Sequence, residues 1–132
     1  MSAPTAAPAR VSLWTGRHGP ATVAIFSLAF LTAFEAIAVL TVMPAVAQDL
    51  DALSWFGVAF AAPMAAAVVT LTVAGWWCDR SGPLRPMVLG VGLVASGLLV
   101  AALAPSMPVF LVGRVVQGLG GGLEGVALYV VI

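Results

Sequence analysis

The sequence predicts an all-α membrane protein with four transmembrane helices. Hydrophobic residues make up 62% of the 132 residues and charged residues only 8%, whereas soluble domains carry about a quarter charged residues. Four apolar segments, each long enough to cross a bilayer as a helix, are separated by short stretches rich in Pro, Gly and Asp. Because backbone groups in hydrocarbon must be hydrogen-bonded within their own segment, we expect helices rather than open strands.

The four segments define the expected domain organisation. Residues 1–20, rich in Ala and Pro, are expected to form a disordered cytoplasmic tail. Transmembrane helices are expected over residues 21–47, 54–77, 86–104 and 109–132. The first apolar run is longer than the about 7–15 residues of a secretory signal, so we expect an uncleaved span. Short connections make successive helices antiparallel, which gives an up-down bundle.

The arginines predict how the chain is oriented in the membrane. Arg10 and Arg17 lie in the tail, and Arg80 and Arg85 lie between the second and third spans. The first and third connections contain no basic residue. Since basic residues of short loops stay on the cytoplasmic side, we expect a cytoplasmic amino terminus in the cell's inner (plasma) membrane.

The composition also excludes several classes of protein. The net charge is zero and no basic cluster is present, so nucleic acid is not an expected partner. The single cysteine, Cys78, excludes an internal disulfide, and no Cys/His spacing predicts a metal site. No nucleophile and base pair and no cofactor motif occur, so we expect neither an enzyme nor a bound cofactor.

Two charged residues within the apolar segments are the first functional candidates. Glu35 falls near the middle of the first segment and Arg114 early in the fourth. A charge at the bilayer centre costs several kcal/mol, about 2.5–3.5 on insertion scales, so Glu35 should face the bundle interior or water. It would then be either a proton carrier or a neutral group that fixes helix packing. Arg114 would be either extended toward the interface or buried.

Glycines share the helical face of Arg114. At 100° per residue, Arg114, Gly118, Gly121 and Gly125 fall within about 40° of one another, with Gln117 and Glu124 on one side. Small residues at this spacing allow another helix or a ligand to approach the backbone. The glycines alone fit a tight helix interface, whereas Arg114 and Gln117 favour a cavity lining. Gly122 and Pro44 are further candidates for helix packing or a cavity lining. Glu124 fits either a pairing with a basic loop residue or the same cavity.

The stretch between the second and third spans resembles a motif of the major facilitator superfamily, specifically of its drug:proton antiporter branches. The family motif reads Gly, three residues, Asp-Arg, one residue and Gly, followed by basic residues. The matching residues here are Gly75, Asp79, Arg80 and Gly82, and Arg85 follows one position late. The resemblance implies a loop that controls the switch between inward-closed and inward-open states.

Two further stretches are similar to the same branches. The run from Arg114 through Gln117, Gly118 and Gly121 to Gly122 is similar to the fourth-helix motif of proton-coupled members, which implies that Arg114 takes part in proton coupling with Gln117 beside it. The first span has an acid, Glu35, nine positions before Pro44, similar to the first helix of drug-efflux members. The resemblance implies that this acid binds protons or cations in a central cavity.

Together these features predict a proton-coupled secondary transporter that exports small, possibly drug-like molecules by alternating access. The family has twelve or fourteen spans in two halves around a central site, so a chain with four spans is expected to be a truncated or partial transporter. Two alternatives take the length at face value. One is a small dimeric multidrug efflux protein with a single membrane Glu, and the other is a structural or regulatory membrane subunit. The expected partners are a small-molecule substrate, protons, the lipid bilayer and the remaining helices.

Overall fold

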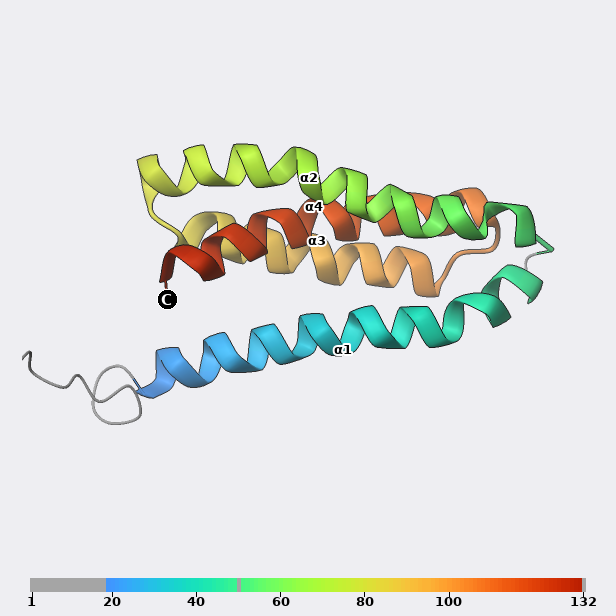
Figure 1. Ribbon diagram of the computed structural model, residues 1–132, viewed down its shortest axis with the longest axis horizontal. Helices are drawn as coiled ribbons and strands as arrows, with labels where there is room; N and C mark the ends of the chain where they lie inside the picture. The colour runs from blue at the N-terminus through green and yellow to red at the C-terminus, as the bar shows by residue number, and fades with distance from the viewer. Residues whose placement is uncertain (1–18, 50, 132) are drawn as a thin grey trace, which may run out of the picture. The chain divides into compact units, whose positions relative to one another are not determined.

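The computed structural model describes residues 19–49 and 51–131, and it is helical apart from short connections. The helices are α1 (Gly19–Asp49), the short 3-10 helix η2 (Leu53–Trp55), α2 (Phe56–Ser81), α3 (Leu84–Ala102) and α4 (Met107–Val131) (Figure 1). The predicted all-α class with four long helices is therefore confirmed. The predicted tail, with Arg10 and Arg17, lies outside the described residues apart from its last two positions.

The chain divides into two units after Glu35, within α1. The first unit contains the amino-terminal part of α1, which is apolar nearly all round. One of its few polar side chains is turned onto the helix itself, since the Thr32 hydroxyl donates to the carbonyl oxygen of Leu28 at 2.9 Å. A helix with so few polar groups that exposes Phe26, Phe30 and Phe34 is suited to a lipid environment.

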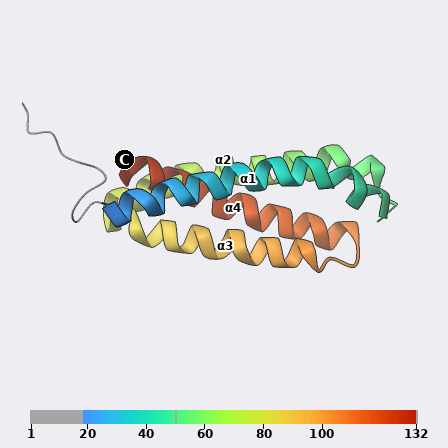
Figure 2. The ribbon, with the colours of Figure 1, turned by 90° about the horizontal axis from the view of Figure 1, so that it is seen from below.

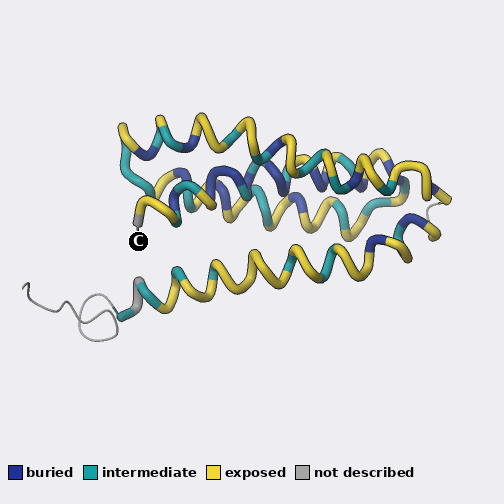
Figure 3. Tube along the Cα trace, in the orientation of Figure 1, coloured by how far each residue is buried: buried dark blue, intermediate teal, exposed yellow. Residues whose placement is uncertain are grey.

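The second unit contains a bundle of α2, α3 and α4, in which α4 lies between the other two (Figures 1 and 2). α4 runs antiparallel to α3 and parallel to α2. Most of the buried positions of this bundle lie on α4, whereas the outer faces of α2 and α3 are exposed (Figure 3). The up-down order is thus present from α2 to α4, and the central helix is the one that bears the polar residues.

A two-residue connection, Gly82 and Pro83, joins α2 to α3. The N–H of Gly82 donates to the carbonyl oxygen of Cys78 at 2.9 Å and so ends α2. Gly82 has φ 78° and ψ 165°, a backbone region that is essentially restricted to glycine. The predicted second span ended at residue 77, but α2 continues to Ser81, so Asp79 and Arg80 lie in its last turn rather than in a loop.

Among the residues that the structure describes, three helical segments are long and apolar enough to cross a membrane: Thr22–Asp49, Leu53–Ser81 and Leu84–Ala102, with mean hydropathies of 2.3, 2.0 and 1.8. α4 is not among them. Arg114, Gln117, Glu124 and a run of glycines lower its hydropathy, although it lies within the bundle. Three of the four predicted spans are therefore supported by length and composition, and the fourth stays a prediction.

Candidate functional site

A buried pair of polar side chains on α4 forms the centre of the candidate site. Nη1 of Arg114 donates a hydrogen bond to Oε1 of Gln117 at 2.7 Å. Only 8% of Arg114 and 4% of Gln117 is exposed. Residues three apart on a helix are neighbours, and a hydrogen bond from a charged donor is among the stronger kinds. The side chain of Arg114 therefore lies inside the bundle rather than extending to an interface.

This pair places a permanent positive charge in an apolar environment. An arginine cannot lose its proton in a protein, so Arg114 can act only through its charge and its hydrogen bonds. Such a charge acts strongly on nearby carboxylates because the surrounding helices screen it little. The arrangement is thus suited to regulating the protonation of an acid or to binding an anionic group.

Glu124 is a third buried polar residue of α4, with 4% of the residue exposed. It lies two turns beyond Gln117, and its backbone contacts α3. A Cβ atom added at Gly90 of α3 would lie 2.8 Å from the nitrogen of Glu124. Both interpretations drawn from the sequence, a pairing with a basic loop residue and a place in the same cavity, stay predictions.

Two of the predicted packing glycines bring α4 against α2. A Cβ atom added at Gly118 would lie 2.6 Å from Cα and 2.7 Å from the carbonyl carbon of Pro63. One added at Gly122 would lie 2.5 Å from the carbonyl oxygen of Ala67 and collide with the hydroxyl of Thr70. Gly118 and Gly122 are therefore residues of a tight helix interface.

The other predicted packing positions make no such contact. A Cβ atom at Gly121 or Gly125 would have no other heavy atom within 4 Å, apart from its own chain neighbours. Pro44 lies within α1 and is exposed. The helical face predicted to hold Arg114 and three glycines therefore contacts α2 at Gly118. At Gly121 and Gly125 the same face has no close neighbour.

Glu35 lies near the middle of α1 and is partly exposed. It is the last residue of the first unit, whereas Arg114 and Gln117 belong to the second. The predicted grouping of Glu35 with Arg114 and Gln117 therefore stays a prediction.

The predicted gating residues lie around the α2–α3 turn. Gly75, Asp79 and Arg80 are in the last two turns of α2, Gly82 ends that helix, and Arg85 is in the first turn of α3. Asp79, Arg80 and Arg85 are exposed.

The guanidinium of Arg80 lies 4.2 Å from the ring centroid of Trp76, one turn earlier. A cation over an indole face is stabilised, and a basic residue in the last turn also complements the helix dipole. Arg80 is thus held on its own helix, at the surface of the bundle.

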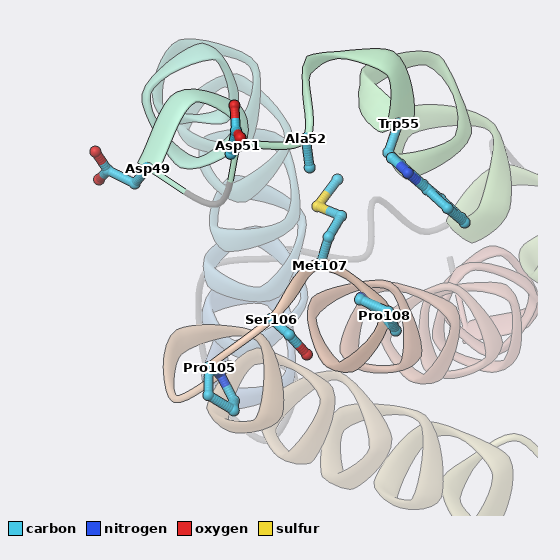
Figure 4. A pocket seen from close by; sticks show the side chains of 8 residues that line it. All are labelled: Asp49, Asp51, Ala52, Trp55, Pro105, Ser106, Met107 and Pro108. Carbon is cyan, nitrogen blue, oxygen red and sulfur yellow. The ribbon is translucent and has the colours of Figure 1, made fainter.

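The connections that precede α2 and α4 meet at the opposite end of the bundle. A pocket there is lined by residues of both connections and of the adjoining helix ends (Figure 4): Asp49, Asp51, Ala52, Trp55, Pro105, Ser106, Met107 and Pro108. Buried Met43, Ala59 and Phe110 pack with Ala52 and Met107 beneath it. These two connections lack arginine, and their proximity agrees with the predicted alternation of the helices. Among the described residues, no group of three His, Cys, Asp or Glu side chains could hold a metal ion.

Sequence reasoning missed two glycines of α3 that face α4. A Cβ atom at Gly97 would lie 2.6 Å from both the oxygen of Gly113 and the nitrogen of Gln117, and one at Gly90 would lie 2.8 Å from the oxygen of Gly120. Gly90 and Gly97 are seven residues apart, as are Gly113 and Gly120. A spacing of seven keeps residues on nearly one helix face, so this repeat was the signal available in the sequence.

Comparison with known proteins identifies a family match over most of the chain. The family described as Major Facilitator Superfamily matches residues 25–132. The MFS-type transporter TOXA of Cochliobolus carbonum is 33% identical over 107 residues, which cover 78% of this chain and 19% of the relative. The MFS-type efflux pump MMF1 of Pseudozyma antarctica is 33% identical over 103 residues, which cover 75% of this chain and 18% of the relative.

A bacterial relative matches a shorter part. The multidrug resistance protein B homolog of Mycobacterium tuberculosis is 38% identical over 60 residues, 46% of this chain and 11% of the relative. The chain thus spans about a fifth of the length of the two fungal relatives. No solved structure matches the chain.

Proposed function

Because the chain belongs to the major facilitator superfamily, a family of transporters, we propose that it forms the first four helices of a transporter that exports small, drug-like molecules in exchange for protons. Membership makes the chain part of a multi-pass membrane protein and not an enzyme. It also removes the alternative of a small dimeric efflux protein of another family. Export is supported by the relatives, one of which is named an efflux pump and another a multidrug resistance protein.

The buried Arg114 and Gln117 pair is the observation that supports proton coupling most directly. A helix that keeps an arginine buried, with only 8% of Arg114 exposed, does so at a considerable cost in desolvation. A purely structural helix could avoid that cost with an apolar residue. We therefore assign the pair to the transport cycle and not to stability alone.

The proposed cycle uses alternating access between two halves of a full-length transporter, meaning the chain at the length of its relatives. Glu35 binds a proton in competition with the substrate, and Arg114 takes part in coupling that proton to transport. Asp79 and Arg80 stabilise one of the two gate states at the α2–α3 turn. A ligand shifts the equilibrium between the two gate states only if it binds one state more tightly than the other. The proton and the substrate must therefore prefer opposite gate states.

The proposed orientation has the amino terminus and the α2–α3 turn in the cytoplasm. The turn bears Arg80 and Arg85, whereas the connections that line the opposite pocket bear Asp49 and Asp51. This distribution follows the rule that basic residues flanking spans stay inside. Export would then proceed toward the face that contains the pocket.

A single substitution tests this function. In cells that express the full-length transporter, we expect protonophore-sensitive efflux of ethidium, and we expect Glu35→Gln to abolish it because the amide cannot exchange a proton. The amount of protein in the membrane, measured by immunoblot, should be unchanged. Ethidium efflux by Glu35→Gln at the wild-type rate would refute the assignment of Glu35 as the proton-binding acid.

A further inference from the structure

The interface between α3 and α4 contains a short repeat. In α4, Gly113 and Gln117 are four residues apart, and Gly120 and Glu124 repeat this pattern seven residues later. Gln117 and Glu124 are both 4% exposed. Each pattern therefore presents a glycine and a buried polar residue to the same side of the helix.

α3 meets each pattern with a glycine of its own. A Cβ atom at Gly97 would lie 2.6 Å from the oxygen of Gly113 and 2.8 Å from Cγ of Gln117. A Cβ atom at Gly90 would lie 2.8 Å from the oxygen of Gly120 and from the nitrogen of Glu124. Real Cβ atoms are not found at such distances, so neither position accepts a side chain without a shift of the backbone.

We propose that Gln117, held against Gly97 of α3, is the positioning residue for the guanidinium of Arg114. At Gly97 the absence of a side chain lets the stem of Gln117 lie directly on the α3 backbone. The far end of the same side chain is fixed by its bond to Nη1 of Arg114, 2.7 Å away. α3 thereby determines where the positive charge of α4 lies, although it contributes no polar side chain to the pair.

The physical reason is the loss of side-chain freedom. A glutamine and an arginine are among the side chains that lose the most rotamer entropy when they are ordered. Packing against Gly97 already confines the aliphatic part of the Gln117 side chain. Gln117 therefore loses less rotamer entropy when its hydrogen bond to Arg114 forms. The role of the Arg114 charge in proton coupling rests on the proposed function. The positioning of Arg114 by Gln117 and Gly97 does not depend on transport.

The chain offers matched controls for this role. Gly90→Ala introduces a collision with α4 comparable to that of Gly97→Ala, but at Glu124 rather than at Gln117. Gly92→Ala adds the same methyl group to α3 where no other heavy atom lies within 4 Å. An effect on Arg114 that is common to Gly97→Ala and Gly90→Ala would be a general packing effect.

The first experiment observes the guanidinium directly. The full-length transporter, with arginine labelled with ¹⁵N, is placed in lipid nanodiscs, and the resonance of Arg114 is identified by its loss in Arg114→Lys. We expect separate, slowly exchanging Nη protons for Arg114, unlike those of exposed Arg80 and Arg85. Gly97→Ala and Gln117→Met should both abolish that separation, whereas Gly90→Ala and Gly92→Ala should retain it.

Two outcomes would overturn the proposal. One is an unchanged Arg114 signal in Gln117→Met, a variant that removes the acceptor at nearly constant volume and so keeps the test valid if Gly97→Ala fails to fold. The other is loss of the signal in Gly90→Ala as well as in Gly97→Ala. This experiment uses no substrate and no proton gradient. Its result on Arg114 therefore stays valid if the proposed transport function is refuted, and a negative result on Arg114 does not refute the transport function.

The consequence for transport is measured in the full-length protein. We expect Gln117→Met to lower ethidium-driven proton exchange about tenfold, as the loss of one hydrogen bond to a charged group implies. Gly92→Ala should retain the wild-type rate. Wild-type exchange in Gln117→Met would show that the position of Arg114 does not matter to the cycle.

Discussion

Gly82 combines a helix end with a backbone conformation that other residues rarely adopt. Its φ of 78° and ψ of 165° lie in a region that costs a residue with a Cβ atom about 1–3 kcal/mol. No heavy atom lies near the position of an added Cβ, so the requirement is conformational and not steric. The family motif therefore has a glycine here for a reason that the structure makes explicit.

We expect Gly82→Ala to lower the free energy of unfolding by about 1–3 kcal/mol. Gly75→Ala is the matched control, because Gly75 has helical geometry and no neighbour near its missing Cβ. It should be neutral or stabilising by up to about 1 kcal/mol. Thermal unfolding in detergent micelles, followed by circular dichroism, measures both variants. Equal midpoints for the two variants would mean that the conformation of Gly82 is not required.

At the scale of single residues, the sequence predicted some contacts and could not predict others. The proximity of Gln117 to Arg114 follows from their spacing along one helix, and it was anticipated. The importance of Gly90 and Gly97 was not anticipated, although their spacing of seven residues, which Gly113 and Gly120 repeat in α4, is visible in the sequence. Their distances to the α4 backbone could not be predicted, since these depend on the register between the two helices.

Among the helices of the bundle, α4 is the one that packs extensively against both others, α2 and α3. Glycines face α3 at Gly113 and Gly120 and face α2 at Gly118 and Gly122. Small residues at helix interfaces allow the backbones to approach closely, which is how helices associate where the solvent is as apolar as their side chains. The polar residues of α4 are tolerated because the neighbouring helices cover them.

We expect Gly118→Ala to weaken the contact between α2 and α4. The new methyl group would lie within 3 Å of backbone atoms of Pro63, which cannot move independently of the helix. Overpacking of this kind costs about 1–3 kcal/mol. Gly121→Ala, on the same helix but facing open space, should cost nothing. Titration of each variant with sodium dodecyl sulfate in mixed micelles gives the two free energies of unfolding. Equal values would show that the close approach of α2 and α4 does not contribute to stability.

The four helices were predictable as elements because an apolar run longer than about 18 residues is typical of a membrane-spanning helix. The end of α2 was not predicted. The helix continues through Asp79 to Ser81, since charged residues do not end a helix and the first strong stop is Gly82. The lower hydropathy of α4 is itself visible in the sequence, and it leaves this helix outside the apolar spans.

The whole molecule combines an apolar exterior with polar groups inside the bundle. The outer faces of α2 and α3 expose large hydrophobic residues, while Arg114, Gln117 and Glu124 are buried (Figure 3). This is the reverse of a soluble protein and fits a protein surrounded by a bilayer. Family and class were predictable from the sequence motifs. The predicted grouping of Glu35 with Arg114 and Gln117 stays a prediction.

Proton exchange in everted membrane vesicles tests the proposed function most directly. Respiration acidifies the vesicle interior and quenches acridine orange, and an antiporter of the proposed kind releases protons when ethidium is added. We expect the full-length transporter to restore the fluorescence, and vesicles without it to show no change. No restoration by the wild-type protein, under conditions in which it still exports ethidium from cells, would contradict proton coupling.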